Sequence, residues 1–179
     1  MKNSALKISL TALSACLICV CAWVGLPIAG VPMTLQTFGV AFCGYLLGAR
    51  GGMAATALYL ALGAAGLPVF AGFGGSLAFL VGPTGGFLFG FLPLVFLVGI
   101  SSRRESAFGE GLLAVLGLAL CHLSGVLWFA YVSGISSAQA FFLTSLPYLV
   151  KDFISLILAR VLFYKIRKRC ARFSFFREF

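Results

Sequence analysis

The sequence predicts an all-α, polytopic membrane protein with six transmembrane helices and both termini in the cytoplasm. Of its 179 residues, 61% are hydrophobic and 9% are charged, whereas about a quarter of the residues in soluble domains are charged. The mean hydropathy is +1.11. Apolar runs of about 20 residues, the length of a membrane-spanning helix, are separated by short breaks of Gly, Pro or charged residues. Together these observations exclude an ordinary soluble domain.

Basic residues occur in every second break between the apolar runs. They are Lys2 and Lys7, Arg50, Arg103 and Arg104, and the segment that begins at Lys165. The other breaks, near 26–33, 65–82 and 133–143, contain no basic residue. The positive-inside rule therefore places both termini in the cytoplasm and the chain in the cytoplasmic (inner) membrane. The polybasic stretch 165–172 suits anionic lipid, so the net charge of +9 needs no nucleic-acid partner.

We expect one membrane-embedded domain over 1–179. Its helices are predicted at about 7–25, 35–48, 52–65, 84–100, 111–132 and 144–166. The break at 48–52 is too short for anything except an antiparallel turn. Gly85 and Gly86 should let the fourth helix approach its neighbours closely.

The first helix carries two pairs of small residues at a spacing of four. They are Thr11 with Ala15, and Ala12 with Cys16. Such pairs let another backbone approach closely, either within this chain or from another subunit.

Two outer breaks are rich in Gly and Pro. The segment 25–37 cannot form a continuous helix, and its Thr34, Gln36 and Thr37 supply hydrogen-bonding groups where the second helix should begin. Thr34 could equally be a helix cap. The uncharged segment 66–86 lacks the Lys-Ser/Thr ending of a phosphate-binding loop, so it does not predict a nucleotide site. With Phe70, Phe73 and Phe79 it predicts a flexible apolar lid over an uncharged ring system.

The last helix holds an unusual carboxylate. The chain has four Asp and Glu residues, and Asp152 is the one outside the basic loops and the tail. A helix that begins near Thr144 places it roughly 12 Å inside a hydrocarbon layer about 30 Å thick. A charge there costs about 2.5–3.5 kcal/mol, which favours a substrate, ion or proton site. The alternative is that Lys151 neutralises Asp152, or that Asp152 bonds a neighbouring helix and fixes packing; adjacent helical residues are not an ideal pair.

Other chemistry-bearing residues indicate no catalytic or metal site. The cysteines are scattered through apolar runs as small fillers, and His122 has no second ligand or carboxylate at helical spacing. We therefore expect His122 to be a packed or hydrogen-bonded side chain. An enzyme such as an intramembrane transferase would need a paired carboxylate, a Cys/His arrangement or a metal cluster.

Three motifs carry a resemblance to a known family. They are Val31-Pro32-Met33-Thr34-Leu35-Gln36-Thr37, the stretch from Tyr59 through Gly66-Leu67-Pro68-Val69-Phe70-Ala71-Gly72, and Gly82-Pro83-Thr84-Gly85-Gly86-Phe87. With these motifs the chain resembles BioY, the biotin-binding S component of energy-coupling factor (ECF) vitamin transporters. The resemblance implies a non-enzymatic biotin-uptake protein of six helices. It also implies a transmembrane coupling subunit and two ATPase subunits as partners, which alone use ATP, so that no cofactor is expected here.

The resemblance further implies a set of site residues. The biotin-binding residues would be Asp152, Lys151, Tyr148, Thr34, Gln36, Phe73, Gly74, Gly75 and Ser155. The coupling-subunit contact would be Thr11, Ala12, Ala15 and Cys16. Pro147 and Asp152 match the Pro-x-x-x-x-Asp pattern of the family, and this carboxylate would accept the ureido N–H groups of biotin. The pattern departs on either side: Lys151 takes a Gly position, and Ser155 takes the position of a Lys. The alternative is an S component for another vitamin or a biotin precursor.

Overall fold

The computed structural model describes residues 2–28, 31–102 and 106–170 of the chain. Arg103, Arg104 and Arg172, which entered the prediction of orientation, lie outside these residues. The elements in chain order are α1 (Lys2–Trp23), β1 (Gly25–Ile28), β2 (Val31–Thr34), α2 (Gln36–Ala64), the 3₁₀ turn η1 (Ala71–Phe73), α3 (Leu77–Val81), α4 (Gly85–Ser101), α5 (Ala107–Ser133), α6 (Ser137–Thr144) and α7 (Leu146–Cys170).

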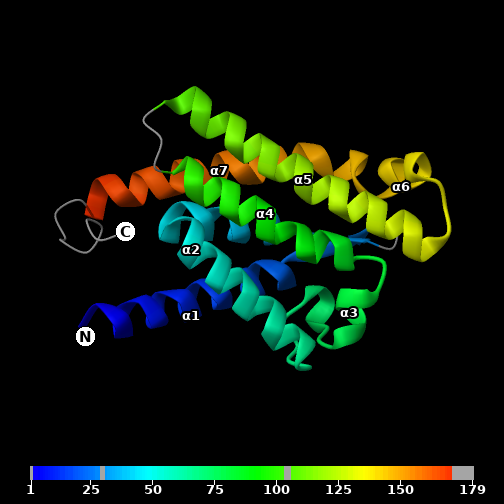
Figure 1. Ribbon diagram of the computed structural model, residues 1–179, viewed down its shortest axis with the longest axis horizontal. Coiled ribbons are helices and arrows are strands. Elements are labelled where there is room, and N and C mark those ends of the chain that lie inside the picture. Colours follow the sequence, from blue (N-terminus) through cyan, green and yellow to red (C-terminus); the bar gives the residue numbers. More distant parts are fainter. Residues whose placement is uncertain (1, 29–30, 103–105, 171–179) are drawn as a thin grey trace.

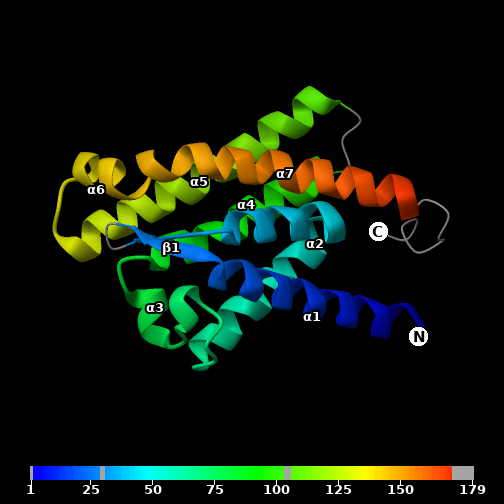
Figure 2. The same ribbon diagram turned by 180° about the vertical axis from the view of Figure 1, so that it is seen from behind.

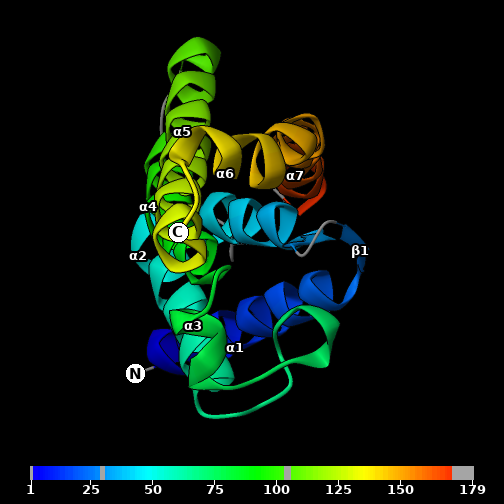
Figure 3. The same ribbon diagram turned by 90° about the vertical axis from the view of Figure 1, so that its right-hand side faces the viewer.

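The long helices form an elongated bundle. The start of α1 and the end of α7 lie at one end of the molecule, and the β1–β2 strands, α3 and α6 lie at the other (Figure 1, and from behind in Figure 2). Viewed end-on, α7 and β1 lie on one side of the bundle, and α4 and α5 lie on the other (Figure 3).

Length and apolar composition qualify three helices of the described chain as membrane-spanning. They are Ser4–Trp23, Gln36–Ala64 and Ala107–Ser133, while α4 is apolar but shorter. The chain is thus mostly helical and carries apolar helices suited to a membrane.

The α2 segment consists of two helices joined by one residue with a positive φ angle. Gly48 has φ 68° and ψ −178°, a conformation that residues with a Cβ rarely adopt. A Cβ built on Gly52 would lie 3.2 Å from the Cα of Gly44, which shows that the chain reverses there. The predicted helices 35–48 and 52–65 and the antiparallel turn between them therefore fit the structure. The end of α4 closes on the same turn, because a Cβ on Gly99 would meet the Ala49 amide.

The core lies where α4 packs between α2 and α5. Leu94, Val95 and Val98 of α4 are fully buried. A Cβ on Gly44 would lie 2.9 Å from the Val95 carbonyl oxygen, so the two backbones touch only because a glycine stands there.

Four boundaries differ from the predictions. The segment 25–37 contains an antiparallel hairpin that pairs Gly25 with Thr34, so the fold is not purely α. The region 137–144 forms its own helix, and α7 begins at Leu146 with Pro147 in its first turn, where a missing N–H costs nothing. The first helix begins at Lys2 instead of 7. Ser106 caps α5 by accepting from the Gly109 amide, so Glu110 lies in a helix and not in a loop.

Candidate functional site

A cavity of about 380 Å³ lies at the end of the bundle that holds the β1–β2 hairpin. This volume falls within the range of small-molecule sites, about 300–1,000 Å³. Segments from both halves of the chain line it: Pro32, Thr34, Gln36, Thr37, Phe70, Ala71, Ala78, Phe79, Gly82, Pro83, Thr84, Phe87, Leu88, Phe91, Cys121, His122, Thr144, Tyr148 and Lys151.

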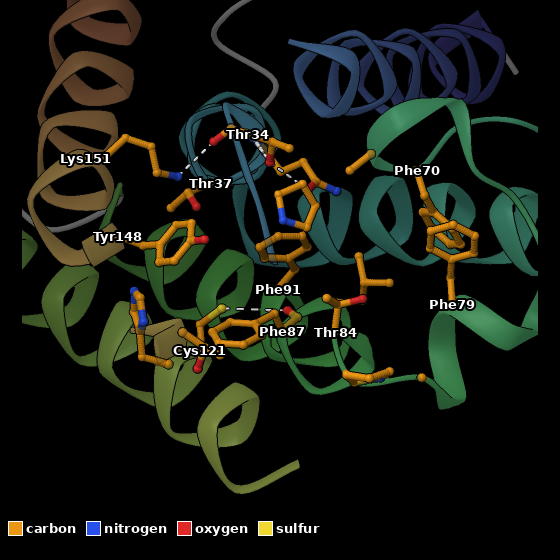
Figure 4. A pocket seen from close by; sticks show the side chains of 18 of the residues that line it. Thr34, Thr37, Phe70, Phe79, Thr84, Phe87, Phe91, Cys121, Tyr148 and Lys151 are labelled. Atoms are coloured by element: carbon orange, nitrogen blue, oxygen red, sulfur yellow. Dashed lines mark hydrogen bonds between the residues drawn. The ribbon is translucent and has the colours of Figure 1, made fainter. Parts of the chain in front are cut away.

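One wall of the cavity is polar and comes from α7. Tyr148 and Lys151 project from this helix toward the cavity (Figure 4). The Lys151 Nζ donates a hydrogen bond of 2.8 Å to the backbone oxygen of Thr34 and forms an ion pair with Asp152 Oδ1. The ion pair shows that the expectation that these two neighbouring residues pair poorly is wrong here. Lys151 thereby connects α7 to the end of the hairpin.

Asp152 lies directly behind this wall and is 5% exposed. Its Oδ2 lies 3.2 Å from His122 Nε2 of α5, and Thr37 of α2 is a further hydrogen-bonding partner. As the alternative to a binding site, Asp152 was expected to pair with Lys151 or to bond a neighbouring helix. The structure contains both contacts. The carboxylate is nevertheless next to the cavity, because two of its partners, His122 and Lys151, line it.

His122 is the residue whose role the sequence did not reveal. It is hydrogen-bonded as expected, with Nδ1 2.9 Å from Ser145 Oγ, but its other nitrogen meets the candidate carboxylate. The two residues lie on different helices, so no spacing along the chain could have indicated their contact.

A second polar chain runs from the hairpin into α2. The Thr34 hydroxyl donates to Gln36 Oε1 at 2.7 Å, and Gln36 Nε2 donates to the Tyr59 hydroxyl at 2.5 Å. The backbone N–H of Gln36 also donates a hydrogen bond of 3.3 Å to the Thr34 hydroxyl oxygen. These contacts fix the start of α2 against its second half and present amide and hydroxyl groups to the cavity.

The remaining walls are aromatic. Phe70 and Phe79 lie across the cavity from Lys151, with Phe87 and Phe91 between them (Figure 4). Phe70 is 1% exposed and packs edge-on against Tyr59, with 5.4 Å between ring centroids. Flat apolar faces opposite a charged wall suit a ligand with an apolar ring and a polar edge.

The loop before α4 is held in place by Trp128 of α5. Its Nε1 donates to the Gly82 carbonyl at 2.9 Å. A Cβ on Gly86 would lie 2.5 Å from the Ser124 carbonyl oxygen, so the predicted close approach of Gly86 is present.

The predicted biotin-binding residues fall into two groups. Thr34, Gln36, Tyr148 and Lys151 line the cavity, and Asp152 contacts two lining residues. Ser155 is buried on α7, and it is outside the lining set together with Gly74, Gly75 and Phe73.

Phe73 faces away from the cavity. It is 64% exposed, has a φ of 58° and stacks on Trp23 at 5.2 Å between ring centroids. Phe70 and Phe79 supply the aromatic cover instead.

The two small-residue pairs of α1 face different ways. Ala15 is buried in the bundle, and the Thr11 hydroxyl donates to the Lys7 carbonyl of its own helix. Ala12 and Cys16 are exposed.

A buried ion pair lies outside the cavity lining. Glu110 of α5 is 1% exposed, and its Oε2 accepts from Arg160 Nη2 at 2.9 Å and from the Tyr164 hydroxyl at 3.1 Å. Glu110 lies within α5, so the prediction that the carboxylates other than Asp152 fall in the basic loops or the tail is wrong. Within the described chain, no three His, Cys, Asp or Glu side chains gather as a metal site.

Comparison with known proteins identifies the family. A sequence model of the BioY family matches residues 1–172. The chain is 40% identical to the biotin transporter BioY of Thermotoga maritima over 85% of this chain and 90% of that protein. It is 37% identical to the probable biotin transporter BioY of Pyrococcus horikoshii over 83% of this chain and 88% of that protein.

A solved structure agrees with these sequence matches. The crystal structure of the S-component for biotin from an ECF-type ABC transporter aligns with a TM-score of 0.84 at 29% identity, covering 93% of both chains. The resemblance carried by the three loop motifs is thus confirmed, and the chain belongs to the BioY family.

Proposed function

We propose that this chain binds biotin in the cavity at the hairpin end and serves as the substrate-binding subunit of an ECF-type biotin transporter. The observation that carries the proposal is the cavity itself, in which a charged wall from α7 faces an aromatic wall from α3 and α4. Biotin has matching parts: a ureido group with two N–H donors, an apolar ring and a carboxylate on a flexible chain. The names of the relatives support the same ligand.

In this proposal, each polar part of biotin contacts one or more of the predicted residues. A buried carboxylate accepts urea N–H groups through charge-assisted hydrogen bonds, which is the role proposed for Asp152. Lys151 provides a positive charge at the cavity wall for the valerate carboxylate. Tyr148, Thr34 and Gln36 supply hydroxyl and amide groups along the same wall. Phe73, Gly74, Gly75 and Ser155 would contribute to the surrounding structure instead of contacting ligand.

The membrane arrangement is part of the proposal. Six spans in the inner membrane would be α1, the two halves of α2, α4, α5 and α7, with both termini in the cytoplasm. The cavity would then open toward the outside, because it lies at the end opposite the first and last residues described (Figure 1).

Partner subunits would use the exposed pair on α1. Ala12 and Cys16 form a small-residue surface on which a coupling subunit could pack closely, whereas Ala15 is already covered. Two ATPase subunits would supply the energy, and ATP would bind only to them.

Binding of labelled biotin to the purified protein tests the ligand. We expect saturable binding of one biotin per chain that unlabelled biotin displaces. Dethiobiotin and other vitamins serve as competitors: displacement by another vitamin alone would establish the alternative of a different S component. No saturable binding of any of them would refute the proposal. Growth of a biotin auxotroph with and without the coupling subunits tests the partners.

A further inference from the structure

His122 bridges two residues at the start of α7. Its Nδ1 lies 2.9 Å from the Ser145 hydroxyl, and its Nε2 lies 3.2 Å from Asp152 Oδ2. All three side chains are buried: Ser145 is 0% exposed and His122 is 7% exposed. The imidazole also packs edge-on against Phe87, with 6.0 Å between ring centroids. The ring is therefore held on three sides and has one orientation.

The chemistry of the three groups determines where the proton lies. An ionised carboxylate can only accept hydrogen bonds, so Nε2 must carry the hydrogen that faces Asp152. In the neutral ring Nδ1 is then an acceptor, and the Ser145 hydroxyl donates to it. Lys151 forms an ion pair with the other carboxylate oxygen, Oδ1, so the two oxygens contact different side chains.

We propose that His122 is a positioning residue for ligand binding: the hydrogen bond from its Nε2–H fixes the Asp152 carboxylate in one orientation beside the cavity, and the Ser145 hydroxyl completes the arrangement by donating to Nδ1. The inference rests on the proposed function for its ligand, biotin. In this proposal, α5 contributes the residue that orients the carboxylate of α7. His122 connects α5 to α7 at this point. Without this contact, the carboxylate would be free to rotate toward Lys151.

Two substitutions separate the positioning role from simple packing. The amide nitrogen of Gln reaches the place of Nε2, so His122→Gln should keep biotin affinity within about threefold of wild type. The amide of Asn reaches only the place of Nδ1, so His122→Asn should weaken binding by about tenfold to a hundredfold, through loss of a hydrogen bond to a charged group. Thermal unfolding of both ligand-free variants is the control. Equal affinities for the two variants, or losses that follow their unfolding temperatures, would overturn the proposal.

The tautomer can be observed without ligand. The sequence contains one histidine, so ¹⁵N-histidine labelling gives one pair of ring nitrogen signals once a histidine-free purification tag is used. We expect a protonated Nε2 and an unprotonated Nδ1 in the wild-type protein. A protonated Nδ1 with a bare Nε2 would refute the contact between His122 and Asp152 on which the proposal rests. A wild-type protein with these signals that fails to bind biotin would refute the proposed function while leaving the hydrogen-bond relay intact.

Discussion

Replacing Asp152 by Asn removes one negative charge from the best-connected side chain beside the cavity while keeping its size. The carboxylate is 7% exposed and contacts Lys151, His122 and Thr37. Removing one partner of a fully buried ion pair costs about 3–5 kcal/mol. Lys151 is 22% exposed and keeps its bond to the Thr34 carbonyl, so we expect a smaller loss of unfolding free energy, about 1–3 kcal/mol.

The effect of Asp152→Asn on binding follows from the same contacts. Hydrogen bonds to a charged group contribute about 1.5–3 kcal/mol, so we expect biotin to bind about tenfold to a hundredfold more weakly. Equilibrium dialysis with labelled biotin measures the affinity. Heating followed by size-exclusion chromatography measures the stability of the same preparation.

Glu110→Gln is the matched control. Glu110 is also a buried carboxylate with a basic partner, Arg160 at 2.9 Å, but neither residue lines the cavity. This variant should lose stability by a comparable amount and bind biotin like wild type. Unchanged affinity in Asp152→Asn, or an equal loss of affinity in Glu110→Gln, would show that Asp152 acts only through the stability of the bundle.

Three further substitutions test other parts of the structure. Lys151→Met removes the donor to the Thr34 carbonyl, so hydrogen exchange in the β1–β2 hairpin should rise; unchanged exchange would show that this contact does not hold the hairpin. Gly48→Ala forces a Cβ into φ 68°, and should lower the unfolding free energy by about 1–3 kcal/mol, whereas Gly111→Ala, in open space on α5, should not lower it. Ala12→Trp should leave biotin binding intact and abolish co-purification with a coupling subunit; retained co-purification would place that contact elsewhere.

Most of the helical architecture could be predicted because it follows from apolar length and from breaks. Gly48 marks a reversal that the sequence shows as a Gly-rich break of a few residues. The strands β1 and β2 could not be predicted, since they pair through backbone hydrogen bonds, which do not depend on a side-chain pattern. Two prolines in the segment also argued against any regular structure.

The candidate site could be predicted only in part, because it is assembled from different helices. Lys151, Tyr148, Thr34 and Gln36 were found through local patterns in one segment each. His122 was given no role at the site because its partner carboxylate is on α7, thirty positions away along the chain, and no periodicity reports that contact. Phe70 and Phe79 of the cavity lining lie in the segment that was predicted to form an apolar lid, whereas Phe87 and Phe91 could not be distinguished from many similar residues in apolar runs.

The single-residue turn at Gly48 has a consequence for how a solute reaches the cavity. The turn and the last residues of α4 pack backbone against backbone at the base of the bundle, where a side chain at Gly99 would have no room. At the opposite rim, the connection before α4 and the β1–β2 ribbon lie beside the cavity. If the chain binds biotin as proposed, the ligand would enter and leave through that rim, where connections and not helix ends border the cavity.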